Sequence, residues 1–168
     1  MRQDCKFLMG EYTDQTVIIG VGNILMQDEG IGVHIVRELR KMKLPKEVKL
    51  VDGGTCGLDL TGFMEEAKKV IIVDALKGGE EPGAIYRLTL DDIAPSSEYV
   101  TSLHQIGLFE ALNILELLKK GRPKEVIIIG VTPKEIKWNL ELSKELKERF
   151  PDIIKVVLAE VESIGKFR

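Results

Sequence analysis

Short runs of β-branched residues alternate with longer segments of helical period, and this alternation constrains the fold most. Thr16–Val21, Val70–Val73 and Glu125–Gly130 are rich in Val and Ile and have the length of strands. Such continuous apolar runs are typical of strands covered on both faces, as in parallel sheets. Parallel neighbours need right-handed crossover connections, which are usually helical. The sequence therefore predicts a sheet with helices on both faces.

The segments between these runs supply the crossovers and two further strands. Helical periodicity predicts helices over Glu29–Met42, over Leu58–Glu66, and from a Ser102-x-x-Gln105 capping box to about Lys120. Lys46–Val51 reads as a strand. Ala84–Leu90 alternates with period two, which indicates a strand with one exposed face, at an antiparallel edge of the sheet.

The chain is predicted to be a three-layer α/β/α sandwich around a mostly parallel sheet of about five strands, with one antiparallel edge strand. Its 168 residues suit one domain, which we place at 15–168 after an N-terminal extension, 1–14. Toward the C-terminus a helical pattern runs from about Leu140 to Phe150. Pro151 is expected to interrupt it before a second helical stripe.

Charge and composition exclude several classes of protein. The chain has 24 Lys and Arg against 27 Asp and Glu, so no net basic field favours nucleic acid. Its apolar runs are far shorter than the ~20 residues that span a bilayer, which argues against membrane insertion. The two cysteines, Cys5 and Cys56, are far apart and form no Cys-x-x-Cys pair, so we expect free thiols in a cytoplasmic protein.

Ligands of open parallel sheets bind beyond the carboxyl ends of the strands, where the loops converge. The predicted loops carry polar side chains at four such places. Glu29 follows the first strand, Asp52 the second and Asp74 the third, and His104 lies in the turn that opens a later helix. Acid and imidazole side chains are therefore expected along one edge of the sheet.

Nucleotide binding fits this edge poorly. Gly20-x-Gly22 follows a strand, but Leu25 stands where the third glycine of a dinucleotide-binding loop belongs. Asp28 and Glu29 would repel a pyrophosphate at the start of the helix. The sequence also contains neither a G-x-x-x-x-G-K-[ST] loop nor a G-x-S-x-G elbow.

A metal site fits the edge better, because two carboxylates and an imidazole suit a borderline divalent ion such as Zn²⁺ or Ni²⁺. Each residue also has an ordinary structural explanation. Glu29 could stabilise a helix N-terminus, Asp74 could form a strand-end turn, and His104 could be a helix residue without a ligand. Asp28 is expected to cap the first helix, Asp52 could cap the following turn, and His34 is expected to be a surface or partly packed residue.

Five blocks in order resemble the signature of the hydrogenase maturation endopeptidases, a nickel-dependent family that processes [NiFe]-hydrogenase large subunits. They cover about 16–158 and read Gly20-Val21-Gly22-Asn23-Ile24-Leu25-Met26-Gln27-Asp28-Glu29-Gly30-Ile31-Gly32, Asp52-Gly53-Gly54-Thr55, Ile72-Val73-Asp74-Ala75, Ser102-Leu103-His104-Gln105-Ile106-Gly107-Leu108 and Gly130-Val131-Thr132-Pro133. Leu140-Glu141-Leu142-Ser143 also resembles the pattern of the family.

This resemblance implies an endopeptidase that removes a C-terminal extension from a [NiFe]-hydrogenase large-subunit precursor. It places the metal-binding positions at Glu29, Asp74 and His104, and Asp52 at the position suspected of a direct part in cleavage. The nickel is expected to arrive with the precursor, and the protein is expected to be a monomer. The resemblance leaves open whether the protease is of the aspartic or the metallo type.

A second hypothesis uses the same residues without catalysis. The chain would then be a nickel-binding or chaperone module that docks on the hydrogenase precursor. Loss of mass from the C-terminus of a nickel-loaded precursor would identify the protease, and a complex without cleavage would identify the binder.

Overall fold

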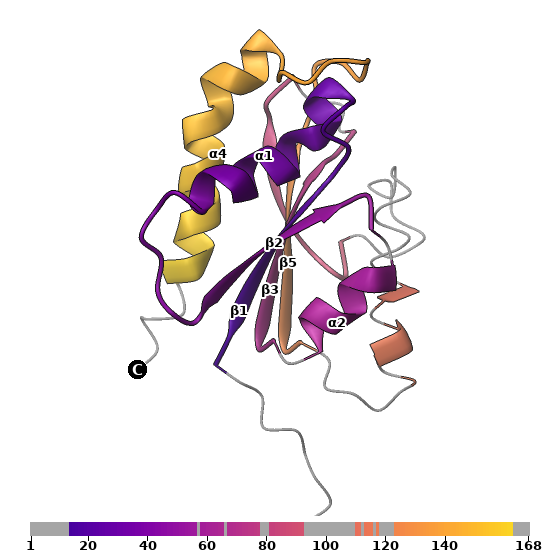
Figure 1. Cartoon of the computed structure of the whole chain (residues 1–168), viewed down its shortest axis with the longest axis vertical. Coiled ribbons are helices and arrows are strands. Elements are labelled where there is room, and N and C mark those ends of the chain that lie inside the picture. Colours follow the sequence, from indigo (N-terminus) through magenta and orange to yellow (C-terminus); the bar gives the residue numbers. More distant parts are fainter. Residues whose placement is uncertain are drawn as a thin grey trace, which may run out of the picture.

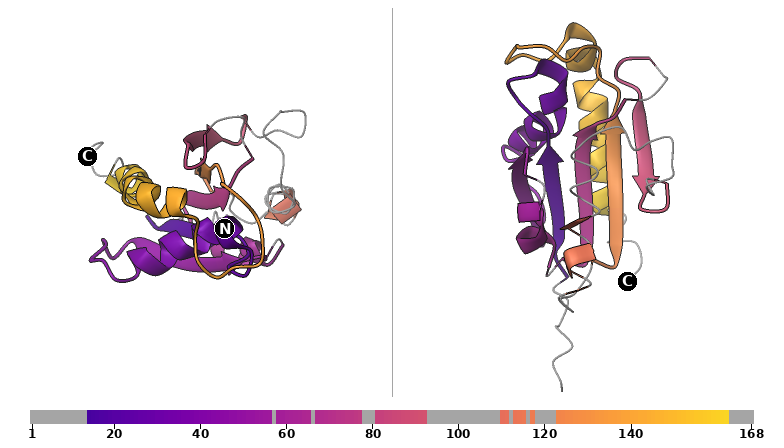
Figure 2. Two further views of the ribbon diagram at one scale, coloured as in Figure 1. Left: turned by 90° about the horizontal axis from the view of Figure 1, so that it is seen from above. Right: turned by 90° about the vertical axis from the view of Figure 1, so that its right-hand side faces the viewer.

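The computed structural model describes residues 14–56, 58–65, 67–77, 81–92, 110–111, 113–115, 117 and 123–162. They form one five-stranded sheet of order β2-β1-β3-β5-β4. The strands are β1 (Thr16–Val21), β2 (Val48–Gly54), β3 (Lys69–Ala75), β4 (Ile85–Thr89) and β5 (Glu125–Val131). All neighbours are parallel except β4 and β5, so the predicted antiparallel edge strand is confirmed. Figure 2 shows β4 running against the other strands.

Helices cover both faces of this sheet, as predicted. Between β1 and β2 lie the 3-10 turn η1 (Gln27–Gly30) and the helix α1 (Ile31–Leu39). The turn η2 (Leu58–Leu60) and the helix α2 (Thr61–Met64) precede β3, and α4 (Lys144–Glu162) follows β5. The described residues between 110 and 117 are also helical. In Figure 1, α1 and α4 lie on one side of the sheet and α2 lies on the other.

Alternation along the buried strands divides the core in two. Side chains such as Ile19, Ile72 and Ile128 pack with Met64 of α2 and with Leu115. The residues next to them in each strand point the opposite way, because successive side chains of a strand alternate between faces. These residues pack on α1 and α4 and include Ile18, Ile71, Val73, Ile129 and Val131.

Two glycines bring α1 close to the strands. A Cβ added to Gly20 would lie 2.1 Å from the carbonyl oxygen of Gly32, and one added to Gly32 would lie 2.0 Å from that of Val73. Any other residue at either place would therefore push α1 away from β1 and β3. This close approach sets the position of η1, which immediately precedes α1 and contacts β3.

The prediction that Pro151 interrupts the last helix is wrong. Residues 144–162 form one continuous helix with Pro151 inside it. The residues before and after the proline continue one apolar stripe, with Leu146, Ile153 and Val157 all fully buried against the sheet. The packing of this stripe outweighs the hydrogen bond that the proline removes, which local propensity alone does not predict.

A partly buried ion cluster fixes α4 near the amino ends of the parallel strands. The Lys69 side chain is only 5% exposed, and its Nζ lies 3.1 Å from Glu160 Oε2 and 3.4 Å from Glu125 Oε1. Arg87 of β4 also donates to Glu160. Hydrogen bonds from Arg87 and then from Lys69, opposed by burial, hold the pKa of the Glu160 carboxyl below its usual value.

Within the part of the chain that the structure describes, no helix is long and apolar enough to cross a membrane.

Removing the charge of Glu160 is expected to destabilise the fold, because Lys69 would stay buried beside fewer acceptors. We expect Glu160→Gln to lower the free energy of unfolding by about 3 kcal/mol in urea denaturation. Glu141→Gln is the matched control, because it breaks a similar contact, to Lys147, at an exposed site. An equal effect of both substitutions would show that burial of the cluster has no special weight.

Candidate functional site

Glu29 and Asp74 come from neighbouring elements at the carboxyl edge of the sheet. Glu29 lies in η1, which contacts β3, and its side chain is half-buried. Asp74 is the second-last residue of β3 and is only 3% exposed. Its Oδ1 accepts the backbone N–H of Ala75 at 2.8 Å. The structure thus brings two of the predicted metal-binding carboxylates to the same edge.

The third predicted metal-binding residue, His104, lies outside the described residues. Alternation along β3 assigns Asp74 to the same face as Ile72, where Ala111 and Leu115 of the following helical segment are packed. Among the residues that the structure describes, no three His, Cys, Asp or Glu side chains form a group able to hold a metal ion. The set of Glu29, Asp74 and His104 therefore stays a prediction.

Asp52 lies at the end of β2 and belongs to the opposite face. A register shift between Gly20 and Val21 leaves Gly53 unpaired, which is a β-bulge directly after Asp52. Such bulges redirect side chains at sheet edges and next to active sites. The Nε and Nη2 atoms of Arg37 in α1 lie 3.3 and 3.2 Å from Asp52 Oδ2, at a partly exposed site. Asp52 is therefore held on the side of α1.

Asp28 is a buried bridge and not the expected cap of the first helix. It is fully buried, and neither η1 nor α1 has a side-chain cap. Its Oδ2 accepts the backbone N–H groups of Lys134 and Glu135 at 2.9 and 3.3 Å, and its Oδ1 accepts that of Ser143 at 2.7 Å. Hydrogen bonds to a carboxylate are stronger than those between neutral groups. Asp28 thus fastens η1 to a distant loop.

We call this loop, residues 132–143, the strap. It runs from the end of β5 to Ser143, whose Oγ accepts the N–H of Leu146 and so caps α4. The strap also pairs with the loop after β1, where Gln27 donates its N–H to the Asn139 carbonyl at 2.8 Å. Gln27 is buried with φ of 53°, a conformation that non-glycine residues rarely adopt. Local strain is therefore retained beside Glu29.

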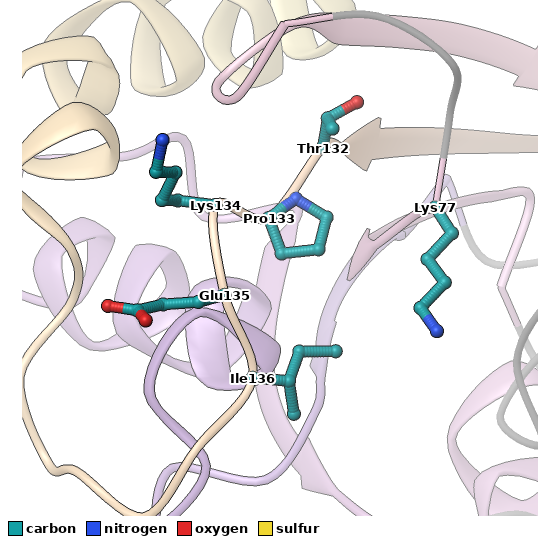
Figure 3. A pocket seen from close by; sticks show the side chains of 6 residues that line it. All are labelled: Lys77, Thr132, Pro133, Lys134, Glu135 and Ile136. Carbon is teal, nitrogen blue, oxygen red and sulfur yellow. The ribbon is translucent and has the colours of Figure 1, made fainter.

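A cleft of about 300 Å³ lies between the strap and the residues after β3. In Figure 3 the side chains of Lys77 and Ile136 flank it, whereas Lys134 and Glu135 point away. Thr132 also lines it, and the hydroxyl oxygen of this buried residue has no hydrogen-bond partner among the described residues. The edge of the sheet therefore offers a recess with one ammonium group and apolar walls.

The bridge through Asp28 and the strap are what sequence reasoning missed. Asp28 directly precedes a helical pattern, so a cap was the natural local interpretation. Its partners lie more than 100 residues away in the chain, and they are backbone groups, which carry no sequence signature. The helical pattern predicted from about Leu140 is confirmed only from Lys144, where α4 begins. The apolar residues before it, Ile136 and Trp138, lie in a segment without helical or strand period, and they were the available signal of the strap.

Replacement of Asp28 by Asn is expected to destabilise the protein, because an amide nitrogen would face backbone N–H donors. We expect Asp28→Asn to lower the free energy of unfolding by about 3 kcal/mol, given the cost of unpaired buried donors. Thermal or urea denaturation measures this change. Asp59→Asn, on an exposed residue of η2, is the control and should leave the midpoint unchanged. Equal midpoints for both variants would contradict the bridging role.

His34 of α1 is partly packed, as the sequence predicted. It lies between Val33 and Ile35, both buried, and its buried Nε2 has no hydrogen-bond partner within the part of the chain that the structure describes. Burial, and then the charge of Arg37, lower the pKa of His34 from its usual value of 6.5. The folded protein therefore favours the neutral imidazole, while the unfolded chain takes up the proton more readily.

The His34 pKa predicts a loss of stability in acid. Because the unfolded state binds more protons below pH 6.5, the free energy of unfolding should fall as the pH drops from about 7.5 to about 5.5. His34→Gln should show a flatter dependence over the same interval, measured by urea denaturation at each pH. Parallel curves for the two proteins would assign the acid sensitivity to other groups.

Fold and site together define an α/β protein whose carboxylates gather at the carboxyl edge of a mostly parallel sheet. Residues 33–160 match the family model described as hydrogenase maturation protease. The chain is 37% identical to the hydrogenase expression/formation protein HupD of Bradyrhizobium diazoefficiens, over 88% of this chain and 79% of that protein. It is 32% identical to the hydrogenase 2 maturation protease of Escherichia coli, over 89% and 92%.

The solved structure of the hydrogenase maturating endopeptidase HybD from E. coli superposes with a TM-score of 0.82. That match has 32% sequence identity and covers 90% of this chain and 94% of HybD. The chain therefore belongs to the hydrogenase maturation protease family. It is an endopeptidase of hydrogenase maturation, and the resemblance stated from the sequence is confirmed.

Proposed function

We propose that this endopeptidase removes the C-terminal extension of a [NiFe]-hydrogenase large-subunit precursor after nickel insertion, and that it recognises the nickel carried by the precursor. The observation that carries this proposal is that a half-buried Glu29 and a buried Asp74 lie on two elements in contact, η1 and β3, at one edge of the sheet. Neither carboxylate is at an ordinary surface position, and both come from elements held in place by close packing.

Glu29, Asp74 and His104 are proposed to contact the nickel of the precursor. Two carboxylates and one imidazole leave coordination positions free for ligands that come with the substrate. This set contains no thiolate, so it would hold a free ion weakly, and cysteines of the precursor would supply the soft ligands. A bound divalent ion can polarise a carbonyl group or acidify water. In this proposal its first use is to mark a precursor that is ready to be cut.

Asp52 is proposed to act in peptide cleavage as the acceptor of a proton from the attacking water. Both hydrogen bonds from Arg37 go to Oδ2 of Asp52. This contact orients the Asp52 carboxylate. The bulge at Gly53 sets the direction in which Asp52 leaves the strand. Because Asp52 lies on the face of α1, the precursor would have to reach across the edge of the sheet to contact both Asp52 and Asp74.

The setting of the reaction belongs to the same proposal. We place the protein in the cytoplasm, where the thiol of Cys56 would stay reduced. The enzyme is proposed to act as a monomer that binds one precursor. The alternative of a non-catalytic nickel-binding module is disfavoured, because the relatives at 32% identity are named a maturation protease and a maturating endopeptidase.

Single substitution of the three proposed nickel-contacting residues is expected to abolish processing of the nickel-loaded precursor. Glu29→Gln, Asp74→Asn and His104→Asn each remove a ligand with little change of shape. Mass spectrometry of the precursor would show no loss from its C-terminus, while circular dichroism would show an intact fold. The control is Glu38→Gln, because Glu38 is a half-buried residue of α1 whose carboxylate pairs with the exposed Lys41.

A second arm separates recognition of nickel from simple proteolysis. Wild-type protein should cut the nickel-loaded precursor and leave the nickel-free precursor intact. Normal cleavage by all three variants would refute the assignment of the site, and equal cleavage of both precursors would refute recognition through nickel. A stable complex without cleavage would establish the binding module instead.

A further inference from the structure

Exposed apolar side chains gather at the edge of the sheet that carries Glu29. Among the described residues, seven large hydrophobic side chains are exposed, and four of them lie on the strap or the loop it pairs with. We call these four the apolar patch: Leu25, Ile136, Trp138 and Leu140, which are 44, 41, 79 and 63% exposed. Isolated exposed apolar residues are ordinary, whereas such a gathering marks an interaction surface.

Hydrogen bonds join the two segments that carry the patch. The N–H of Asn139 donates to the carbonyl of Leu25 at 3.0 Å, and Met26 and Asn139 form a parallel bridge. Leu25 and Trp138 each precede one member of this bridge, so they are neighbours across it. Glu29 follows only four residues after Leu25. The patch therefore borders the candidate site.

The backbone under the patch is fixed before any partner arrives. Asp28, itself fully buried, holds both ends of the strap through three hydrogen bonds from backbone N–H groups. Two asparagine side chains hold the turns, since Asn23 Oδ1 accepts the N–H of Leu25 and Asn139 Oδ1 accepts that of Glu141, each at 3.0 Å. A surface that is already ordered loses little entropy on binding.

Charged groups around the patch are already paired with one another. Lys137 lies 2.7 Å from Glu135, and Lys147 lies 2.6 Å from Glu141. These contacts hold the pKa of both glutamates below their usual values, so the pairs stay ionised near neutral pH. An apolar centre inside a rim of paired charges is the anatomy of a protein–protein interface. It favours an apolar protein surface over a nucleic acid or a strongly charged peptide.

We propose that the apolar patch docks the hydrogenase large-subunit precursor, through an apolar surface next to the segment that is cut. This inference rests on the proposed function and names the surface by which the substrate is held. Trp138 is the central contact, because it is the most exposed of the four and tryptophan is enriched among residues that dominate binding energy. The carboxylates then act on a precursor that the patch has already positioned.

The test is the initial rate of processing at several concentrations of nickel-loaded precursor. Trp138→Ser and Leu140→Ser are each expected to raise KM about tenfold with kcat within about twofold of wild type. Trp138→Phe should recover most of the loss. Met42→Ser is the matched control, because Met42 is 40% exposed and follows the far end of α1. It should change neither constant.

Each outcome has one reading. An unchanged KM in both serine variants would overturn the docking proposal, and so would a fall in kcat at constant KM. Sedimentation of the protein alone tests a second copy as the occupant, and a dimer that Trp138→Ser dissociates would also overturn it. Absence of cleavage by wild-type protein would instead refute the proposed function, so the two failures are distinguishable. Thermal denaturation should give equal midpoints for all variants, since the changed side chains are exposed.

Discussion

The carboxylate of Asp28 is the contact on which the candidate site depends. One fully buried side chain connects the turn that carries Glu29 to the strap and to the start of α4. A buried carboxylate is costly unless it accepts several hydrogen bonds, and here three backbone N–H groups meet it. The same contact therefore stabilises the loops and sets their geometry. Glu29 is the next residue, so the bridge also fixes the backbone that carries it.

The two ends of the sheet have different tasks. Near the amino ends of the parallel strands, Lys69, Arg87 and Glu160 tie β3, β4 and α4 together in a partly buried ion cluster. At the carboxyl ends, glycines let α1 approach the strands closely, β2 contains a bulge, and Gln27 adopts a positive φ. Stability and chemistry are thus separated along the strands, which lets the carboxyl edge tolerate strain and exposed apolar groups.

The faces of the sheet also divide the candidate residues. Asp74 and Asp52 lie near the carboxyl ends of β3 and β2, which both pair with β1. Alternation along the strands nevertheless assigns the two side chains to opposite faces of the sheet. A substrate that contacts both must therefore cross the edge of the sheet beside η1. The cleft between Lys77 and Ile136 lies at this edge, as Figure 3 shows, and the apolar patch continues from Ile136 along the strap. Docking of the precursor, recognition of its nickel and cleavage of its peptide bond would then all take place along this edge of the sheet.

Most of the fold could be predicted from hydrophobic periodicity, because buried strands and amphipathic helices produce patterns within a few residues of sequence. The run Thr16–Val21 coincides with β1, and Val70–Val73 lies within β3. The period-two segment after Gly83 contains β4, the antiparallel edge strand. Pro151 misled for the opposite reason, because a proline acts locally while the stripe that overrides it packs on the distant sheet. The placement of Glu29 and Asp74 at one edge also followed from topology alone.

By itself, the sequence determined the layer architecture, the antiparallel edge, the family resemblance and the identity of the candidate residues. Only the tertiary structure decided that Asp28 bridges to the strap instead of capping a helix, and that Asp52 is paired with Arg37 on the face away from Asp74. It also decided which apolar residues stay outside the core. The physical reason is range: patterns record contacts made within a helix or strand, whereas a hydrogen bond to a backbone group 106 or more residues away leaves no trace in the residues between.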